Sequence, residues 1–309
     1  MPSFFFPIVG PFPKLSEVTA EAAGFRIHKR QWQTTTFDLA TLASKHKLHV
    51  NWHIMDAFLS TSNCEIEVIY ASDFSAAQER VDLLQSMLYL HFVAPFVIPY
   101  GASHSINQYS GINSRDSTSL AKNLPEGLQI GITSADTTVE AWVHKPTFVI
   151  QHFAGEPIID EGVFRSAAAD ASRWSELENG FKPLRTVRRA FHTAPIIPDL
   201  SSSLLHLWQG IEALFPQVTM EVNFRLALLV AQLAGGLETS SDTYKHVKQC
   251  YSVRSKAAHG NIDNLTNDDW KKSWQLLRLC MCSVLSRDRL PTEDDLMAEL
   301  LGNAHGRDP

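Results

Sequence analysis

Polar and apolar residues alternate in the first half of the chain, which is the pattern of half-buried β-strands. The alternation is clearest in residues 48–54 and again in residues 64–70. Shorter extended segments are predicted near residues 96–98, 128–132, 139–143 and 148–153, and residues 110–127 form a polar, turn-rich loop. One helix interrupts the strands: Asp73 is a plausible N-cap, apolar residues follow from Phe74 at spacings of three and four, and Pro95 should end it.

From about residue 156 the apolar period changes to that of amphipathic helices. Helices are predicted near residues 164–177, 183–193, 199–215, 221–234, 241–258 and 267–290, with a short last helix from Thr292. Six helices with short connections are typical of an antiparallel bundle. We therefore predict an α+β chain, with a mostly β, mixed N-terminal domain of unknown role (1–155) and an all-α helical bundle (156–309).

Composition limits the class of protein. Of the 309 residues, 44% are hydrophobic and 19% are charged, which is typical of a folded globular chain. No clean apolar run reaches the roughly 18 to 20 residues that a membrane-spanning helix needs, and the N-terminus has no basic leader, so neither a membrane partner nor a signal peptide is expected. Four cysteines are too few for a disulfide framework, which favours the cytoplasm. A net charge of −6 argues against a strongly basic surface that would bind duplex DNA without sequence specificity.

Common catalytic and nucleotide motifs are absent from the sequence. The sequence contains neither of the glycine-rich nucleotide-binding motifs, G-x-x-x-x-G-K-[ST] and G-x-G-x-x-G. It also has no G-x-S-x-G nucleophile motif and no H-E-x-x-H zinc motif. We therefore expect no cofactor and no metal.

The segment 251–260, Tyr-Ser-Val-Arg-Ser-Lys-Ala-Ala-His-Gly, carries the most chemical information. Arg254 lies near the apolar stripe of its predicted helix, where an unpaired charge would be costly. His259 follows five residues later; if the helix stops at Ala258, it can swing back toward the face of Arg254. From spacing alone, a simpler interpretation is a helix end, with a histidine near the dipole and Gly260 as the stop.

Three segments in order resemble the ApeA-like branch of the HEPN family. They are residues 207–215 (Leu-Trp-Gln-Gly-Ile-Glu-Ala-Leu-Phe), 223–227 (Asn-Phe-Arg-Leu-Ala) and the Arg-x-x-x-x-His-Gly end of 251–260. The resemblance covers roughly residues 160 to 290, and the N-terminal half fits only loosely, since ApeA-like proteins often carry a β-rich domain there.

The resemblance implies a dimeric, metal-independent ribonuclease whose Arg-x(4–6)-His motifs meet at the dimer interface. Carried over, the catalytic residues are Arg254 and His259. Tyr251, Ser255 and Lys256 of the same segment would support them, although the family more often has Asn, Asp or His at the position of Ser255. Glu212 matches the acidic position of the aromatic helix, and we expect it to pair with Arg254.

These residue types suit RNA cleavage. RNA supplies its own nucleophile, the 2′-hydroxyl, so the protein has to provide proton transfer near pH 7 and a fixed cation for the phosphorane. A histidine and a forked guanidinium provide both, and a two-fold axis doubles each group. The expected product end is a 2′,3′-cyclic phosphate.

Local positive charge supports a phosphate-facing surface despite the acidic total. The basic residues of two predicted helices are further candidates for RNA contacts: Lys245, Lys248, Arg185, Arg188 and Arg189. Ordinary solvated helix faces would have the same composition.

Three functions remain open. The first is an endoribonuclease, a hydrolase acting in antiphage defence or as a toxin, with an antitoxin or defence-system partner. The second is a non-catalytic HEPN module that binds RNA, a nucleotide or a protein partner. The third is an interaction protein whose function lies in the N-terminal half. In the first case, Arg254 and His259 should be exposed in one cleft, facing their symmetry mates.

Overall fold

A computed structural model describes residues 2–30, 33–45, 62–111, 122, 129, 139–141, 155–235, 239–261, 263 and 265–302. The chain divides into two compact units. The first comprises Met1–Pro146 and Gly155–Ala169, and the second comprises Thr147–Ala154 and Asp170–Pro309. An antiparallel sheet region followed by a helical half confirms the predicted α+β class.

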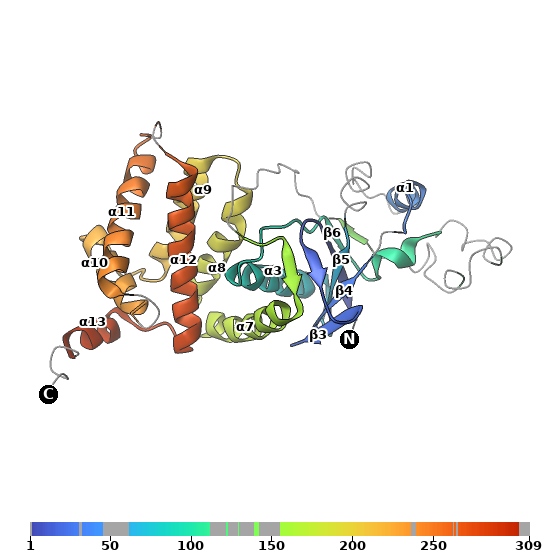
Figure 1. Ribbon diagram of the computed structural model, residues 1–309, viewed down its shortest axis with the longest axis horizontal. Helices are drawn as coiled ribbons and strands as arrows, with labels where there is room; N and C mark the ends of the chain where they lie inside the picture. The colour runs from blue at the N-terminus through green and yellow to red at the C-terminus, as the bar shows by residue number, and fades with distance from the viewer. Residues whose placement is uncertain are drawn as a thin grey trace. The chain divides into compact units, whose positions relative to one another are not determined.

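The first unit contains a six-stranded sheet in the order β3-β4-β5-β1-β6-β7, in which every neighbouring pair is antiparallel (Figure 1). Its strands are β1 (Phe4–Ile8), β3 (Thr19–Ala22), β4 (Phe25–Lys29), β5 (Cys64–Val68), β6 (Tyr100–Ala102) and β7 (Val139–Ala141). A separate parallel pair joins β2 (Phe12–Lys14) to β8 (Ile158–Asp160). The unit also contains helix α1 (Thr36–Lys45) and the 3-10 turn η1 (Ile106–Tyr109).

Helix α3 (Phe74–Leu90) packs on the apolar face of this sheet. The sheet side chains beneath it are fully buried, and Phe74 stacks on Phe6 with ring centroids 5.9 Å apart. The predicted N-cap is confirmed, since the Asp73 carboxylate accepts a hydrogen bond from the Ala76 amide. The helix ends at Leu90 rather than at Pro95, because the backbone at Phe92 turns left-handed (φ 64°).

The opposite face of β5 is also buried, which the alternating sequence pattern does not predict. Glu65 is fully buried, and its carboxylate accepts hydrogen bonds from Arg30 Nε (2.9 Å), Ser105 Oγ (2.7 Å) and the Ile106 amide (2.8 Å). A buried carboxylate is tolerated when it is paired and hydrogen-bonded in this way. The polar positions of β5 therefore face an ion-pair network rather than solvent.

A second buried carboxylate lies two residues further along β5 and involves a histidine. His28 on β4 donates from Nε2 to Glu67 (3.0 Å), and its Nδ1 accepts from the Thr19 hydroxyl (2.9 Å), so the neutral ring is satisfied on both sides. Burial lowers the pKa of His28, and the charge of Arg30 lowers it further. Burial alone would raise the pKa of Glu67, but hydrogen bonds from Ser3 and His28 outweigh it and the pKa is lowered.

We expect the stability of the sheet to fall as the pH drops below about 6.5. The unfolded chain then protonates His28 before the folded chain does, and the contribution of Glu67 disappears as the pH falls further, through its own lowered pKa. Hydrogen exchange of the β4 amides at pH 7.5 and 5.0 would measure the loss. The variant His28→Gln, which does not titrate, should show a smaller difference; an equal difference would contradict the assignment to His28.

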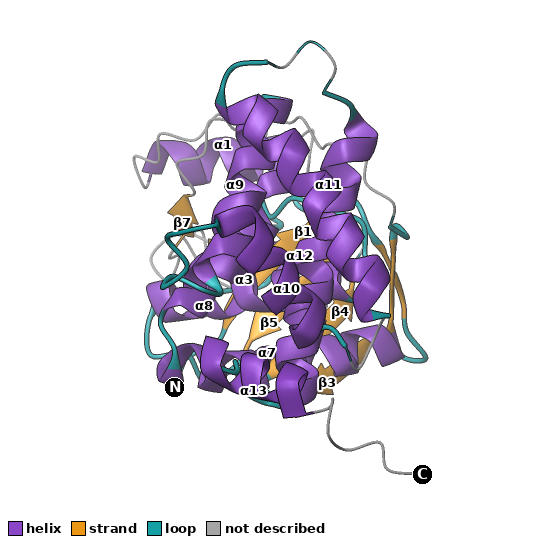
Figure 2. Ribbon diagram, turned by 90° about the vertical axis from the view of Figure 1, so that its left-hand side faces the viewer, coloured by secondary structure: helices purple, strands orange, loops and turns teal. Residues whose placement is uncertain are grey.

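The second unit is helical. Its helices are α7 (Glu161–Gly180), which begins in the first unit, α8 (Pro183–Thr193), α9 (Leu200–Ala213), α10 (Val222–Leu233), α11 (Ser240–Ala258), α12 (Asn267–Arg287) and α13 (Glu293–Gly302). A 3-10 turn, η2 (Ala194–Ile196), joins α8 to α9. Helices α10 and α11 contact each other along their lengths and lie side by side in Figures 1 and 2. Tryptophans fill the core: Trp270 stacks on Trp274, which stacks in turn on Phe191.

Most of the predicted elements are present. The strand from residue 64, the helix after Asp73 and all seven C-terminal helices are confirmed, while residues 96–98 contribute only an isolated bridge, between Val9 and Val97. The four strands of the first 30 residues and helix α1 were not predicted individually. The predicted strands at 48–54 and 148–153 lie outside the described residues, as do most of the loop at 110–127 and the segment at 128–132.

The division between two domains at residue 155 stays a prediction. In the structure, β8 and the start of α7 belong to the first unit. No helix in the described part of the chain is both long and apolar enough to cross a membrane.

Candidate functional site

The C-terminal end of α11 is built by a glycine. Gly260 has a left-handed backbone (φ 75°), its amide donates to the Ala257 carbonyl (3.0 Å), and the Asn261 amide donates to the Lys256 carbonyl (2.9 Å). This pair of hydrogen bonds is the Schellman motif, which satisfies the last carbonyls of a helix. It leaves His259 as the C-cap residue, exposed to solvent.

We expect Gly260→Ala to destabilise the protein by about 1 kcal/mol, because a side chain disfavours the left-handed conformation. No atom lies within 4 Å of an added Cβ at this position, so backbone strain is the cause rather than a clash. Chemical denaturation would measure the change. Gly180→Ala is the matched control: it also has free space, but no left-handed backbone, and should be neutral or stabilising. Equal effects of the two changes would contradict the argument.

His259 lines an open surface pocket of about 410 Å³. The pocket brings together His259, Ser255, Lys256 and Tyr251 from α11, with Asn223 of α10 and Asn261 beyond the helix end. Three of the predicted supporting residues therefore lie around the predicted histidine. A histidine, an ammonium group and hydroxyls at one surface pocket can bind a phosphate and exchange a proton with it.

Arg254 does not line this pocket and is held by Glu212 and Tyr251. Its Nη2 lies 2.8 Å from Oε1 of Glu212 on α9, which confirms the expected pair, and its guanidinium lies 5.6 Å from the ring centre of Tyr251. The Nε of Arg254 and the Oε1 of Glu212 are buried and make no hydrogen bond to any described group. Charge attraction and ring contact, rather than hydrogen-bond geometry, therefore hold the guanidinium.

Arg254 and His259 are not brought into one pocket within the chain. The helix is unbroken through Ala258, and the His259 amide still donates to the Ser255 carbonyl (3.2 Å). Positions five apart on such a helix point about 140° apart, and Arg254 is not among the residues that line the pocket of His259. The swing of His259 toward the face of Arg254 does not occur.

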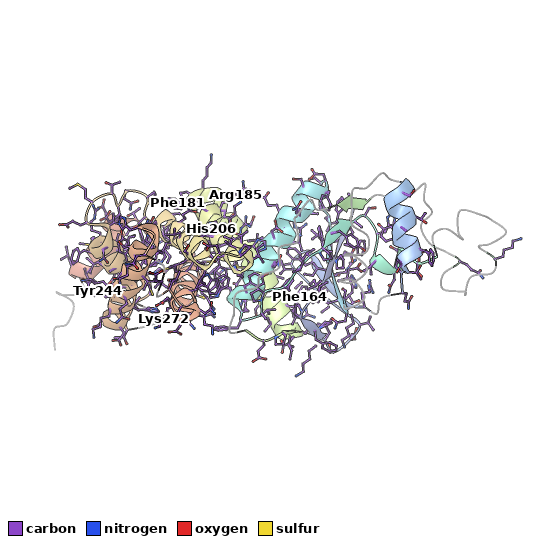
Figure 3. All side chains as sticks on the ribbon, turned by 90° about the horizontal axis from the view of Figure 1, so that it is seen from above. Phe164, Phe181, Arg185, His206, Tyr244 and Lys272 are labelled. Carbon is purple, nitrogen blue, oxygen red and sulfur yellow. The ribbon has the colours of Figure 1, made fainter. Side chains whose placement is uncertain are left out.

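The other basic candidates lie in different environments. Lys245 and Lys248 are exposed on α11; Lys245 lies 3.8 Å from Asp242, and Lys248 lies over the ring of Tyr244. Arg185 and Arg189 are exposed on α8, and Arg185 is labelled in Figure 3.

Arg188 is only 3% exposed and is not available to a phosphate. Its Nε donates to Glu178 Oε1 (2.6 Å) and its Nη2 donates to Oε2 (3.2 Å), while Trp174 donates to the same carboxylate (2.8 Å). It is a buried structural ion pair.

A second open pocket, of about 620 Å³, adjoins the first. Asn223 and Tyr251 line both, and the second adds Phe224, Lys248, Glu221 and Val222. Sequence reasoning missed Asn223 and Phe224 as site residues. The available signal was an aromatic residue beside a polar one at the start of a helix, which is common at ordinary helix ends.

Comparisons with known proteins identify no relative: no family model, curated protein or solved structure matches the chain. Within the described parts of the chain, no three His, Cys, Asp or Glu side chains are grouped so that they could hold a metal ion.

Proposed function

We propose that the protein is a metal-independent endoribonuclease of the HEPN type. The observation that carries the proposal is the exposed His259 at the end of α11, in a pocket with Ser255, Lys256 and Tyr251. The order of motifs in the sequence adds the resemblance to the ApeA-like branch.

The proposed reaction needs only a base, an acid and a cation. A histidine removes the proton of the 2′-hydroxyl, the 2′-oxygen bonds to the adjacent phosphorus, and the bond from phosphorus to the 5′-oxygen breaks as that oxygen takes up a proton. The products are a 2′,3′-cyclic phosphate and a 5′-hydroxyl. A guanidinium stabilises the charge that develops on the phosphorane.

A two-fold dimer supplies these groups together. Because Arg254 and His259 point in different directions within one chain, the proposed site combines groups from two copies around the end of α11. The proposal requires each Arg254 to exchange its contact with Glu212 for the substrate phosphate.

We expect light scattering to show a dimer at tens of micromolar. The contact should include the C-terminal end of α11, so a charge introduced there, Ala258→Glu, should weaken the dimer, since Ala258 is exposed in the single chain. Gln249→Glu, an exposed change on the same helix, is the control. A monomeric wild-type protein would contradict the composite site.

The decisive experiment incubates the purified full chain with total RNA in EDTA, beside the variant His259→Ala. Cleavage that persists in EDTA and disappears in the variant supports the proposal. Absence of cleavage by a dimeric wild-type protein counts against it.

One observation favours the second candidate, a non-catalytic module that binds RNA, a nucleotide or a protein. Arg254 is engaged by Glu212 and Tyr251, as a residue kept for packing would be. The proposed compartment is the cytoplasm, since the four cysteines, all free thiols, suit a reducing environment. For the ribonuclease, the proposed role is antiphage defence or that of a toxin with an antitoxin partner.

A further inference from the structure

The two adjoining pockets form one groove across α10 and α11. We define the α10–α11 groove by the residues Asn223, Phe224, Lys248, Tyr251, Lys256 and His259. Lys248 and His259 are eleven positions apart on α11 and its cap, which corresponds to about 16 Å along the helix axis. The groove is therefore longer than the space that one scissile phosphate occupies.

An exposed aromatic ring lies at the far end of the groove from His259. The side chain of Phe224 is 51% exposed, and that of Met220, just before α10, is 73% exposed. Both are apolar side chains that lie outside the core of the helical unit. Tyr251, half-buried between the two pockets, adds a second ring, packed edge-on against Trp208 (5.4 Å). Exposed rings in a groove offer a flat apolar surface on which nucleobases stack.

The charge of the groove suits a nucleic acid strand. Lys248 lies beside Phe224 in the second pocket and Lys256 lies beside His259 in the first, against a single acidic lining residue, Glu221. A backbone of phosphates can therefore meet an ammonium group near each end while a base contacts the rings.

Asn223, which lines both pockets, has an unused acceptor. Its Oδ1 is buried without a hydrogen-bond partner among the described residues, so turning the amide toward a ligand would give up no hydrogen bond at that oxygen. An asparagine amide has one acceptor and one donor side by side, and the exposed edge of a single-stranded base offers the matching pair: the amino group and ring nitrogen of adenine, or the N3–H and a carbonyl of uracil.

We propose that the α10–α11 groove is a base-binding subsite for single-stranded RNA, in which Phe224 stacks on a base and Asn223 hydrogen-bonds to the edge of that base. The subsite deepens the proposed ribonuclease function and rests on it for its biological role. It lies beyond the scissile phosphate, toward Lys248.

Binding can be tested without cleavage. The probe is a fluorescent 2′-O-methyl oligoadenylate, whose blocked 2′-oxygen cannot attack, titrated with the full chain in an anisotropy assay. We expect Phe224→Leu to weaken binding about tenfold and Phe224→Trp to retain it, because stacking needs a ring. Phe37→Leu, the same change at an exposed phenylalanine of α1, is the matched control and should have no effect.

The same assay, repeated with oligouridylate, tests the role of Asn223. We expect Asn223→Ala to weaken the binding of both oligonucleotides by about two- to tenfold, because either base loses its hydrogen bonds to the amide. Unchanged affinity of Asn223→Ala for both probes would overturn the role of Asn223.

Other outcomes separate this inference from the nuclease proposal. Binding that depends on Phe224 in a protein that cleaves nothing would keep the subsite and remove the nuclease. Cleavage unaffected by Phe224→Leu, or a wild-type protein that binds neither probe, would overturn the subsite. A change of oligomeric state in Phe224→Leu, with unchanged oligonucleotide affinity, would assign the ring to a protein interface and also overturn it.

Discussion

Replacing His259 by alanine is expected to lower the rate of RNA cleavage by roughly 10² to 10⁴-fold and to leave the fold intact. The large effect follows from the loss of proton transfer, and the fold survives because His259 is exposed at a helix end whose hydrogen bonds come from its backbone. Single-turnover cleavage of a defined RNA would measure the rate, and circular dichroism would check the helices. Gln249→Ala, an exposed change on the same helix, is the control and should cleave normally.

The partner change, Arg254→Ala, is expected to reduce cleavage to a similar degree, and Arg254→Lys should not restore it. A point charge lacks the forked geometry with which a guanidinium contacts two phosphate oxygens. The alanine change also leaves the buried Oε1 of Glu212 without its cation, so some loss of stability is expected beside the loss of rate. A deoxy substitution at the cleaved position should block the reaction in the wild-type protein.

Two results would redirect the assignment. Cleavage unaffected by either alanine change would return segment 251–260 to an ordinary helix end. Inhibition by EDTA would instead direct attention to the histidines and acidic residues of the N-terminal half.

Replacing Arg188 by alanine is expected to destabilise the helical unit by about 3 to 5 kcal/mol. The change removes the two hydrogen bonds that Arg188 donates to the largely buried Glu178 carboxylate and leaves it only a weak cationic neighbour among the described residues, the half-exposed Arg185 at 3.9 Å. Urea denaturation followed by tryptophan fluorescence would measure the loss, because Trp174 is fully buried beside the pair.

The neighbouring arginine provides the control. Arg189→Ala removes an exposed charge and should change stability by less than about 0.5 kcal/mol. The double change Arg188→Met with Glu178→Gln should recover much of the lost stability, since it removes both charges and keeps an acceptor for Trp174. A stable Arg188→Ala protein with weakened RNA binding would show instead that Arg188 contacts the substrate.

The sequence predicts the helical half well because each helix has a long apolar stripe and a clear stop. Pro216 and Gly260 follow α9 and α11, and Thr292 precedes α13, as expected from local chemistry. The strands of the first 30 residues are harder to find. They are three to five residues long, and Pro7 and Pro13 lie inside two of them. Such short strands contain too few residues to show an alternating pattern, and proline is unusual inside a strand.

Buried charged residues are hard to predict from a sequence, because their ion-pair partners are distant along the chain. Glu65 looks like a solvent-facing residue of an alternating strand, and only the fold brings Arg30 and Ser105 onto it. Arg188 likewise looks like one cation of an exposed cluster until Glu178 is found beside it. A sequence pattern therefore predicts solvent exposure for a charged residue that is in fact buried, when the partner of that residue lies on another helix or strand.

At the candidate site, features that depend on a single helix can be predicted from the sequence, and features that depend on how two helices pack cannot. The helix end at Gly260 follows from local chemistry, and the pairing of Glu212 with Arg254 is expected from the family resemblance. The groove beside Phe224 depends on how α10 packs against α11, which no residue pattern within either helix specifies.

The parallel pairing of β2 with β8 affects how the protein is made. β2 leaves the ribosome well before its partner, because β8 begins at Ile158, 146 residues after Phe12. At 5 to 20 residues per second, that is a wait of roughly 7 to 30 s. During this interval the nascent chain carries a strand whose edge is open, and a chaperone or another nascent chain can occupy it. The edge closes only when β8 has itself left the ribosome, and the helices that follow α7 emerge after it.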